Sequence, residues 1–122
     1  MPDFELDHSG TAYVLVRARA VVDARTAPAL YEAVRAVVRG EGRRFLAVDL
    51  TGSAVYGPRG FGPLISALKA CRDRGGDLYL INPSETARRV IEHDTWRPVQ
   101  CFGSRGELDR ALLGVCEMVG NG

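Results

Sequence analysis

The spacing of hydrophobic positions changes several times along the chain, and each change predicts a new element of secondary structure. Residues 4–8 alternate between apolar and polar side chains, and residues 11–18 follow with a centre rich in β-forming residues. Ser9 and Gly10, which separate the two segments, favour a turn. We therefore predict an opening β-hairpin, which residues 21–22 either extend or follow as a short third strand.

Residues 26–40 carry apolar side chains at every third or fourth position, which is typical of an amphipathic helix. Thr26 is suited to cap its start, and Gly40 to adopt the left-handed conformation after its end. The same helical spacing recurs three times further along the chain. These later helices are expected to begin near Pro63, at a Ser84 cap, and at a capping box formed by Ser104 and Glu107.

Residues 45–50 form a near-continuous apolar run, typical of a strand covered on both faces in a parallel sheet. Residues 77–81 and 99–102 predict two more strands. The order of elements is then β-β-α-β-α-β-α-β-α. Because strands and helices alternate after the hairpin, we predict an α/β fold: a mixed, mostly parallel sheet of four to five strands, with about four helices and right-handed crossovers.

The composition indicates one ordinary globular domain. Of the 122 residues, 46% are hydrophobic and 25% are charged, and a chain of this size buries enough surface to fold without a disulfide or a metal. We expect a single domain over residues 1–122, with its core at about residues 11–113. The formal net charge of +1 provides no strong attraction to nucleic acid or to an anionic membrane.

The first ten residues carry acids and lack the basic start and apolar stretch of a signal peptide. No apolar run reaches the length that crosses a bilayer. We therefore expect a cytoplasmic protein. Its three cysteines, Cys71, Cys101 and Cys116, are widely spaced and form no zinc-binding motif, so we expect reduced core residues and no metal site.

Several short motifs occur in a fixed order around the strand at residues 45–50, and together they resemble the STAS domain of bacterial anti-sigma factor antagonists. The resemblance runs from about Thr11 to Leu112. Residues 22–30 are similar to the family's segment entering its first helix. The remaining matching positions are Asp49-Leu50, Gly60, Gly75-Gly76 and Asn82-Pro83.

The resemblance implies a STAS-like fold and a regulatory function without catalysis or a cofactor. Such domains bind an anti-sigma factor with a histidine-kinase-like ATPase fold and so release a sigma factor. In many of them the partner phosphorylates a serine in an Asp-Ser-Ser-Gly motif, and the phosphorylated form no longer binds. The start of the helix that carries the motif, with the loop before it, forms the contact surface.

This sequence departs from the family at the phosphorylation motif. Counted from Asp49-Leu50, the motif falls on Gly57-Pro58-Arg59-Gly60, so Pro58 matches the phosphorylated serine. Proline has no hydroxyl group, and phosphate transfer at position 58 is therefore chemically excluded. Thr51 and Ser53 are nearby hydroxyls that are candidate substitute phosphorylation sites, and the alternative interpretation is that they form hydrogen bonds within the loop.

Pro63 affects where the second helix is expected to begin. A proline deep in the first turns deletes a helical hydrogen bond. We therefore predict that the helix begins late, near Gly62 and Pro63, and that residues 57–62 form an irregular exposed loop.

We predict that this loop is the partner-binding surface. Arg59 would supply charge, and Pro58 would fix the loop conformation. Tyr56 and Phe61 would supply buried contact area, and the alternative is that one or both turn inward as core residues. The protein then binds its partner constitutively or has become a scaffold subunit of a signalling assembly, as a monomer or weak homodimer. The predicted contact residues are Tyr56, Gly57, Pro58, Arg59, Gly60 and Phe61, with Asp23 and Ser53 nearby.

The competing hypothesis is a nucleotide- or phosphate-binding protein that uses the Gly57–Gly62 loop, because backbone N–H groups at a helix start bind anions. The stretch lacks both the Walker ending and a complete dinucleotide motif. Asp23 and Asp49 both lie near predicted strand ends, where paired carboxylates either bind a metal, act as acid and base, or cap their loops. No set of nucleophile, base and orienting residue is evident, so we expect no catalytic residues.

Overall fold

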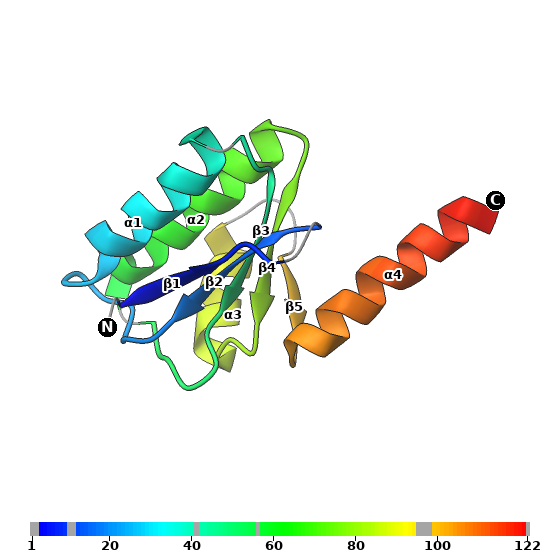
Figure 1. Ribbon diagram of the computed structural model, residues 1–122. Coiled ribbons are helices and arrows are strands. Elements are labelled where there is room, and N and C mark those ends of the chain that lie inside the picture. The colour runs from blue at the N-terminus through cyan, green and yellow to red at the C-terminus, as the bar shows by residue number, and fades with distance from the viewer. Residues whose placement is uncertain (1–2, 10–11, 41, 56, 95–98, 122) are drawn as a thin grey trace.

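The structure is a computed structural model that describes residues 3–9, 12–40, 42–55, 57–94 and 99–121; the side chains of residues 57–60, 90–94 and 114–121 lie outside that description. One five-stranded sheet forms its centre (Figure 1). The strands are β1 Phe4–Asp7, β2 Val14–Ala18, β3 Phe45–Asp49, β4 Asp77–Ile81 and β5 Gln100–Phe102. The helices are α1 Ala27–Arg35, its π-helical continuation η1 Ala36–Gly40, α2 Gly57–Asp73, α3 Glu85–Asp94 and α4 Arg105–Asn121.

The strands lie side by side in chain order, from β1 to β5. The β1 and β2 strands pair in antiparallel fashion, which confirms the predicted hairpin, and the other three pairings are parallel. In the central register, Val16 lies opposite Val48, and Val48 opposite Leu80. Residues 21–22 do not extend β2; Val22 instead forms an isolated parallel bridge with Val55. The predicted α/β architecture is therefore confirmed.

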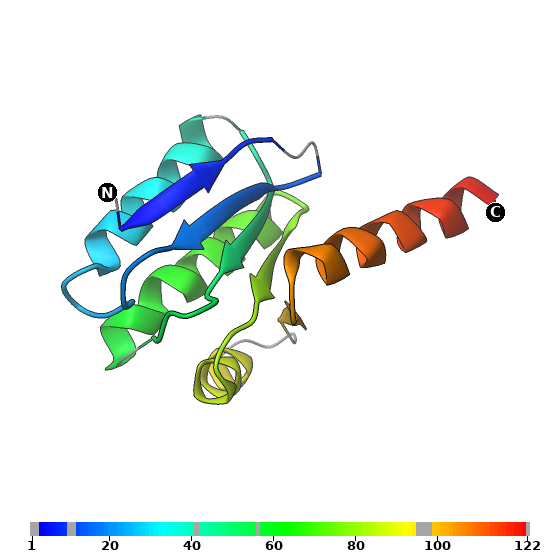
Figure 2. The same ribbon diagram turned by 60° about the horizontal axis from the view of Figure 1, so that its bottom comes forward.

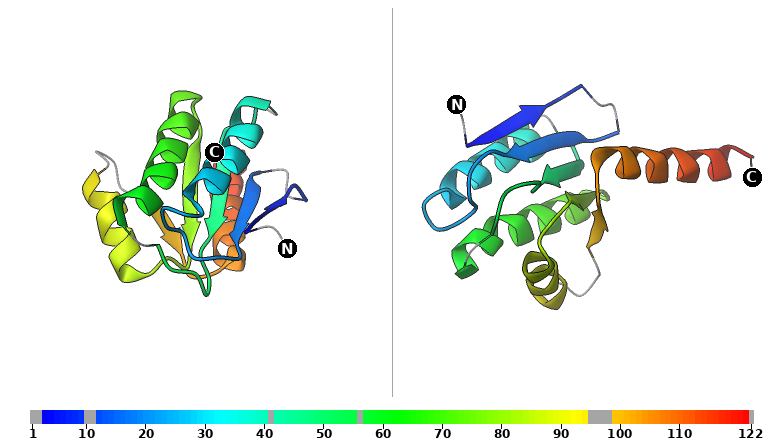
Figure 3. Two further views of the ribbon diagram at one scale, coloured as in Figure 1. Left: turned by 90° about the vertical axis from the view of Figure 1, so that its left-hand side faces the viewer. Right: turned by 90° about the horizontal axis from the view of Figure 1, so that it is seen from below.

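Successive side chains of a strand point to opposite faces of the sheet, so each face carries its own set of apolar side chains. Different helices pack against the two faces. One face carries Val16, Val48 and Leu80, which pack in one cluster with side chains of α1, α2 and α3. The other face forms a smaller cluster around Tyr79 that includes Leu108 from α4. Helices α1, α2 and α3 lie on one side of the sheet, while α4 leads away on the other (Figures 2 and 3).

The three predicted N-terminal caps are correct in position, and the cap of α3 also bonds as predicted, with the Ala87 N–H donating to the Ser84 hydroxyl (3.1 Å). Gly40, by contrast, lies within η1 and is not among the glycines with a positive φ, so its predicted left-handed conformation is wrong. The other two caps differ from the prediction in their bonding. Thr26 precedes α1 as predicted, yet its hydroxyl makes no capping bond and donates instead to the Val21 carbonyl (2.6 Å). At α4, the Glu107 N–H donates to the Ser104 hydroxyl (3.2 Å), which confirms half of the capping box. The Glu107 carboxylate reaches one residue further back than expected and accepts from the Gly103 N–H (2.7 Å).

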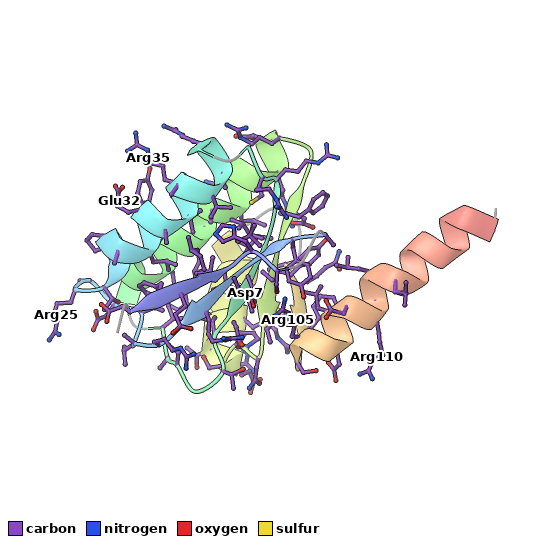
Figure 4. All side chains as sticks on the ribbon, viewed as in Figure 1. Asp7, Arg25, Glu32, Arg35, Arg105 and Arg110 are labelled. Atoms are coloured by element: carbon purple, nitrogen blue, oxygen red, sulfur yellow. The ribbon has the colours of Figure 1, made fainter. Side chains whose placement is uncertain are left out.

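A polar cluster joins the first turns of α4 to the hairpin. The Tyr13 hydroxyl donates to Asp109 (2.5 Å) and accepts from Arg105 Nε (3.2 Å). Arg105 also forms an ion pair with Asp7 (3.0 Å), and these two residues lie close together at the base of α4 (Figure 4). Hydrogen bonds from Ser9 are the largest cause that holds the pKa of Asp7 well below its usual range, and the hydrogen bond from Arg105 is the next. This cluster therefore ties the first turns of α4 to the hairpin.

Candidate functional site

The candidate site lies where β3 leads into α2, and α2 begins earlier than predicted. Helical structure starts at Gly57 and continues through Pro63 to Asp73, so the predicted late start and irregular loop at residues 57–62 are wrong. Pro58 falls in the first turn, where a missing N–H leaves no helical bond unmade. Pro63 does cost a bond inside the helix, and the burial of Leu64 and Leu68 in the core offsets it.

Phe61 is a second correction. Its side chain is 6% exposed and belongs to the core cluster, so it is not available as an interface anchor. The helical spacing already contained the signal, because Phe61, Leu64 and Leu68 recur on one face of a helix. Tyr56 lies outside the described residues, and the side chains of residues 57–60 do too, so their part in the contact surface stays a prediction.

Two loops meet beside the start of α2. The Ser53 hydroxyl donates to the Ala20 carbonyl (2.8 Å), and the Val22 N–H donates to the Ala54 carbonyl (2.8 Å). Both bonds tie the segment after β2 to the segment after β3. The loops carrying Asp23 and Ser53 are thereby brought together, at the edge of the sheet where the parallel strands β2 and β3 end.

The carboxylates of Asp23 and Asp49 each organise their own loop. Asp23 Oδ1 accepts from the backbone N–H groups of Arg25 (2.9 Å) and Thr26 (3.2 Å). Asp49 Oδ1 accepts from the Thr51 N–H (2.9 Å), and its other oxygen lies 3.9 Å from Arg17 Nε. These contacts agree with the loop-capping interpretation. Across the described residues, no group of three potential metal ligands occurs.

The two candidate phosphorylation sites differ in their surroundings. Ser53 is half-buried, and its hydroxyl is engaged with Ala20. Thr51 is exposed at the tip of the turn, next to Gly52, whose positive φ of 73° suits a residue without a side chain. The sequence offered no local signal for the Ser53–Ala20 bond, because its partners are 33 residues apart.

The helical backbone at residues 57–62 also bears on the nucleotide-binding hypothesis. That hypothesis uses an irregular glycine loop whose N–H groups surround a phosphate. In an α-helix, only the first four N–H groups lack a partner within the helix. The stretch Gly57–Gly62 lies within α2, so the loop that the hypothesis requires is absent from this described segment.

The STAS domain family model matches residues 3–93, which is more than half of the chain. The chain belongs to the STAS domain family. No curated protein sequence matches it significantly. Within the STAS frame, α2 begins at Gly57, the first of the four residues predicted to match the family's motif, and the two joined loops lie next to its start.

Solved structures place this STAS domain among similar folds. The unphosphorylated anti-sigma factor antagonist SpoIIAA has a TM-score of 0.75 at 16% identity, over 91% of this chain and 98% of that one. The phosphorylated form of SpoIIAA from Bacillus has a TM-score of 0.73 at 17% identity, over 88% and 98%. An anti-sigma factor antagonist from Mycobacterium paratuberculosis has a TM-score of 0.67 at 24% identity, over 94% and 97%.

No helix within the described ranges of this STAS domain combines the length and apolar character needed to cross a membrane.

Proposed function

We propose that this STAS domain is a non-enzymatic, cytoplasmic regulatory module that binds an anti-sigma factor of the histidine-kinase-like ATPase type. Its contact surface is the start of α2 together with the two loops that meet beside it. The fold likeness to SpoIIAA, which has been solved in unphosphorylated and phosphorylated forms, supports this choice of partner class.

The observation that carries the proposal is the position of Pro58. It is the second residue of α2 and aligns with the serine that the family's partner kinase modifies. A phosphoserine there would add a charge of about −1.5 to −2 beside the positive end of the helix dipole. Proline cannot accept a phosphate, so binding at this surface is not switched at position 58.

The loop geometry supports the same conclusion for Ser53. Its hydroxyl is half-buried and bonded to Ala20, so modification would require that bond to break first. Thr51 is exposed, and its N–H donates to the Asp49 carboxylate (2.9 Å) in the turn that follows β3. We therefore propose a constitutive binding module.

The test is to co-purify the partner from the native host, identify it by mass spectrometry, and measure its affinity with and without ATP. The wild-type chain is expected to keep its affinity and to take up no phosphate. A Gly57→Asp/Pro58→Ser/Arg59→Ser variant, which restores the motif, is expected to be phosphorylated and then released. Gly57→Asp/Pro58→Ala/Arg59→Ser is the matched control, because it differs from that variant only in lacking the hydroxyl at position 58.

Stoichiometric phosphorylation of the wild-type chain at Thr51 or Ser53, with loss of binding, would contradict the constitutive module. Tight binding of ATP or GTP by the chain alone would instead favour the nucleotide-binding hypothesis.

A further inference from the structure

A groove runs between α1 and α2 on the side of these helices that faces away from the sheet. Its apolar walls come from Val34 and Val38 on one helix and from Ala67 and Ala70 on the other, and it encloses about 270 Å³. A neighbouring hollow of about 420 Å³ continues it toward the start of α1. Tyr31 and Pro63 line both hollows, so the two hollows are adjacent. Together they are called the α1–α2 groove.

The lining residues recur at helical spacing along both walls. On the first wall they include positions 27, 31, 34, 35 and 38, and on the second they include positions 63, 66, 67 and 70. The groove therefore follows the axes of the two helices. The wall from Ala27 to Arg39 spans roughly 15–20 Å, which is the length of about three helical turns. A third helix laid along two others is a common way to fill such a groove.

Tyr31 lies at the junction of the two hollows and is 45% exposed. An aromatic ring that projects from the middle of an apolar channel provides a large contact area at a low entropic cost. Pro63 faces it from α2 and is buried, so the opposite wall at this point is rigid.

The end of the groove near the C-terminus of α2 is positively charged. Arg35, Arg39 and Lys69 line it, against one carboxylate, Asp73. All three cations are exposed, and within the described part of the chain no ion pair engages them. Arg35 extends outward from α1 (Figure 4). These cations remain available to an acidic partner.

We infer that the α1–α2 groove is a second docking surface, which takes an amphipathic helix of a partner protein with acidic side chains flanking its apolar stripe. The apolar walls and Tyr31 match the stripe, and the three cations Arg35, Arg39 and Lys69 match the acids. A nucleic acid fits less well, because its phosphates would meet apolar walls and the carboxylates of Glu32 and Asp73. The inference does not depend on the proposed anti-sigma partner, which docks at the start of α2.

The test uses a fluorescent synthetic peptide of about five helical turns, with leucines at every third or fourth position and glutamates on both sides of that stripe. Two matched peptides carry lysines in place of the glutamates, or the same residues in an order without a stripe. Fluorescence anisotropy against the full chain is expected to yield a Kd for the glutamate peptide about tenfold or more below that of either control.

The variants then assign the surface. Arg35→Glu/Arg39→Glu is expected to raise the Kd of the glutamate peptide about tenfold and to lower that of the lysine peptide. Tyr31→Ser is expected to raise the Kd of both the glutamate peptide and the lysine peptide. Arg110→Glu is the control, since it reverses an exposed charge on α4, far from the groove (Figure 4). Circular dichroism checks that each variant is folded.

Three results would overturn the inference: no binding of the glutamate peptide up to about 1 mM, equal binding of all three peptides, or insensitivity to the groove variants. If the chain self-associates and Tyr31→Ser abolishes this self-association, the groove binds a second copy of the chain, and the inference of an acidic partner is wrong. These measurements use only the purified chain and the synthetic peptides, without the anti-sigma factor. Their outcome is therefore independent of the anti-sigma experiment.

Discussion

The Ser53 hydroxyl donates a hydrogen bond to the Ala20 carbonyl at 2.8 Å, across 33 residues of sequence. This bond fastens the loop before α2 to the loop before α1, and so positions the proposed contact surface. The bond also engages the Ser53 hydroxyl, which is one of the two candidate substitute phosphorylation sites. Ser53 therefore acts in the structure as a side chain that holds two loops together.

Replacing Ser53 with alanine should lower the free energy of unfolding by about 1 kcal/mol, because the Ala20 carbonyl loses its donor. Urea unfolding measures this change. Thr51→Ala is the control and should have little effect, since Thr51 is exposed and bonds through its backbone N–H. Equal stability of Ser53→Ala and wild type would show that the bond contributes nothing to loop position.

Phe61→Ala should lower the free energy of unfolding by about 3–5 kcal/mol, because it removes a buried ring from the core. Phe61→Leu should keep most of the stability by refilling the space. Thermal or urea unfolding separates the two variants. A Phe61→Ala protein of wild-type stability that no longer binds its partner would restore Phe61 as an interface anchor.

Arg59→Glu should lower the affinity for an acidic partner about tenfold without lowering the free energy of unfolding. An acidic residue in the first turn of α2 interacts favourably with the helix dipole, so lost binding would not reflect unfolding. Titration calorimetry with the co-purified partner measures the affinity, and Arg110→Glu serves as the charge-reversal control. Unchanged affinity would remove Arg59 from the contact surface.

Asp7 should make stability depend on pH. Its pKa in the folded protein lies below the ordinary value of about 4, so the carboxylate stabilises the fold above that pH and the contribution is lost as pH falls below it. The stability difference between wild type and Asp7→Asn should therefore be constant between about pH 5 and 7 and shrink at about pH 3. Urea unfolding at the three pH values tests this.

Asp73→Asn is the control for the pH experiment, because Asp73 is an exposed carboxylate on α2 outside the cluster with Arg105. A difference for Asp7→Asn that stays the same from pH 7 to pH 3 would mean that the ion pair with Arg105 does not hold the hairpin to α4.

Cys71 should resist alkylation in the folded protein. It is fully buried, and burial, with a smaller effect of Asp77, raises the pKa of its thiol to about 11. The reactive thiolate is therefore scarce at pH 8. Mass spectrometry after iodoacetamide treatment should find Cys71 unmodified in buffer and modified in denaturant. Rapid modification in buffer would mean that α2 opens readily from the sheet.

Local patterns were sufficient for the elements whose apolar spacing and turn residues lie within one short segment. The hairpin follows from turn residues between two β-forming segments, and the parallel strands follow from apolar runs such as residues 45–50. The prediction for the start of α2 is wrong because the burial of Leu64 and Leu68 offsets the local cost of Pro63. The prediction for Phe61 is wrong because the earlier helix start places its side chain in the core.

The candidate site was predictable only in part. Asp49 and Asp23 could be assigned as loop caps from sequence, since each bonds residues two or three positions away. The Ser53–Ala20 bond, the α1–α2 groove and the cluster of Tyr13 with Asp109 join segments that are distant in the chain. No pattern within one segment encodes which distant segment it will face.

The amino-acid sequence by itself determined the order of strands and helices, the family resemblance and the absence of a hydroxyl at Pro58, because periodicity and side-chain chemistry are properties of short segments. The tertiary structure decided where α2 begins, that Phe61 is core, and that Tyr31 shares one groove with Arg35, Arg39 and Lys69. Those features depend on which surfaces are brought together and excluded from water, and that is settled only when the whole chain packs.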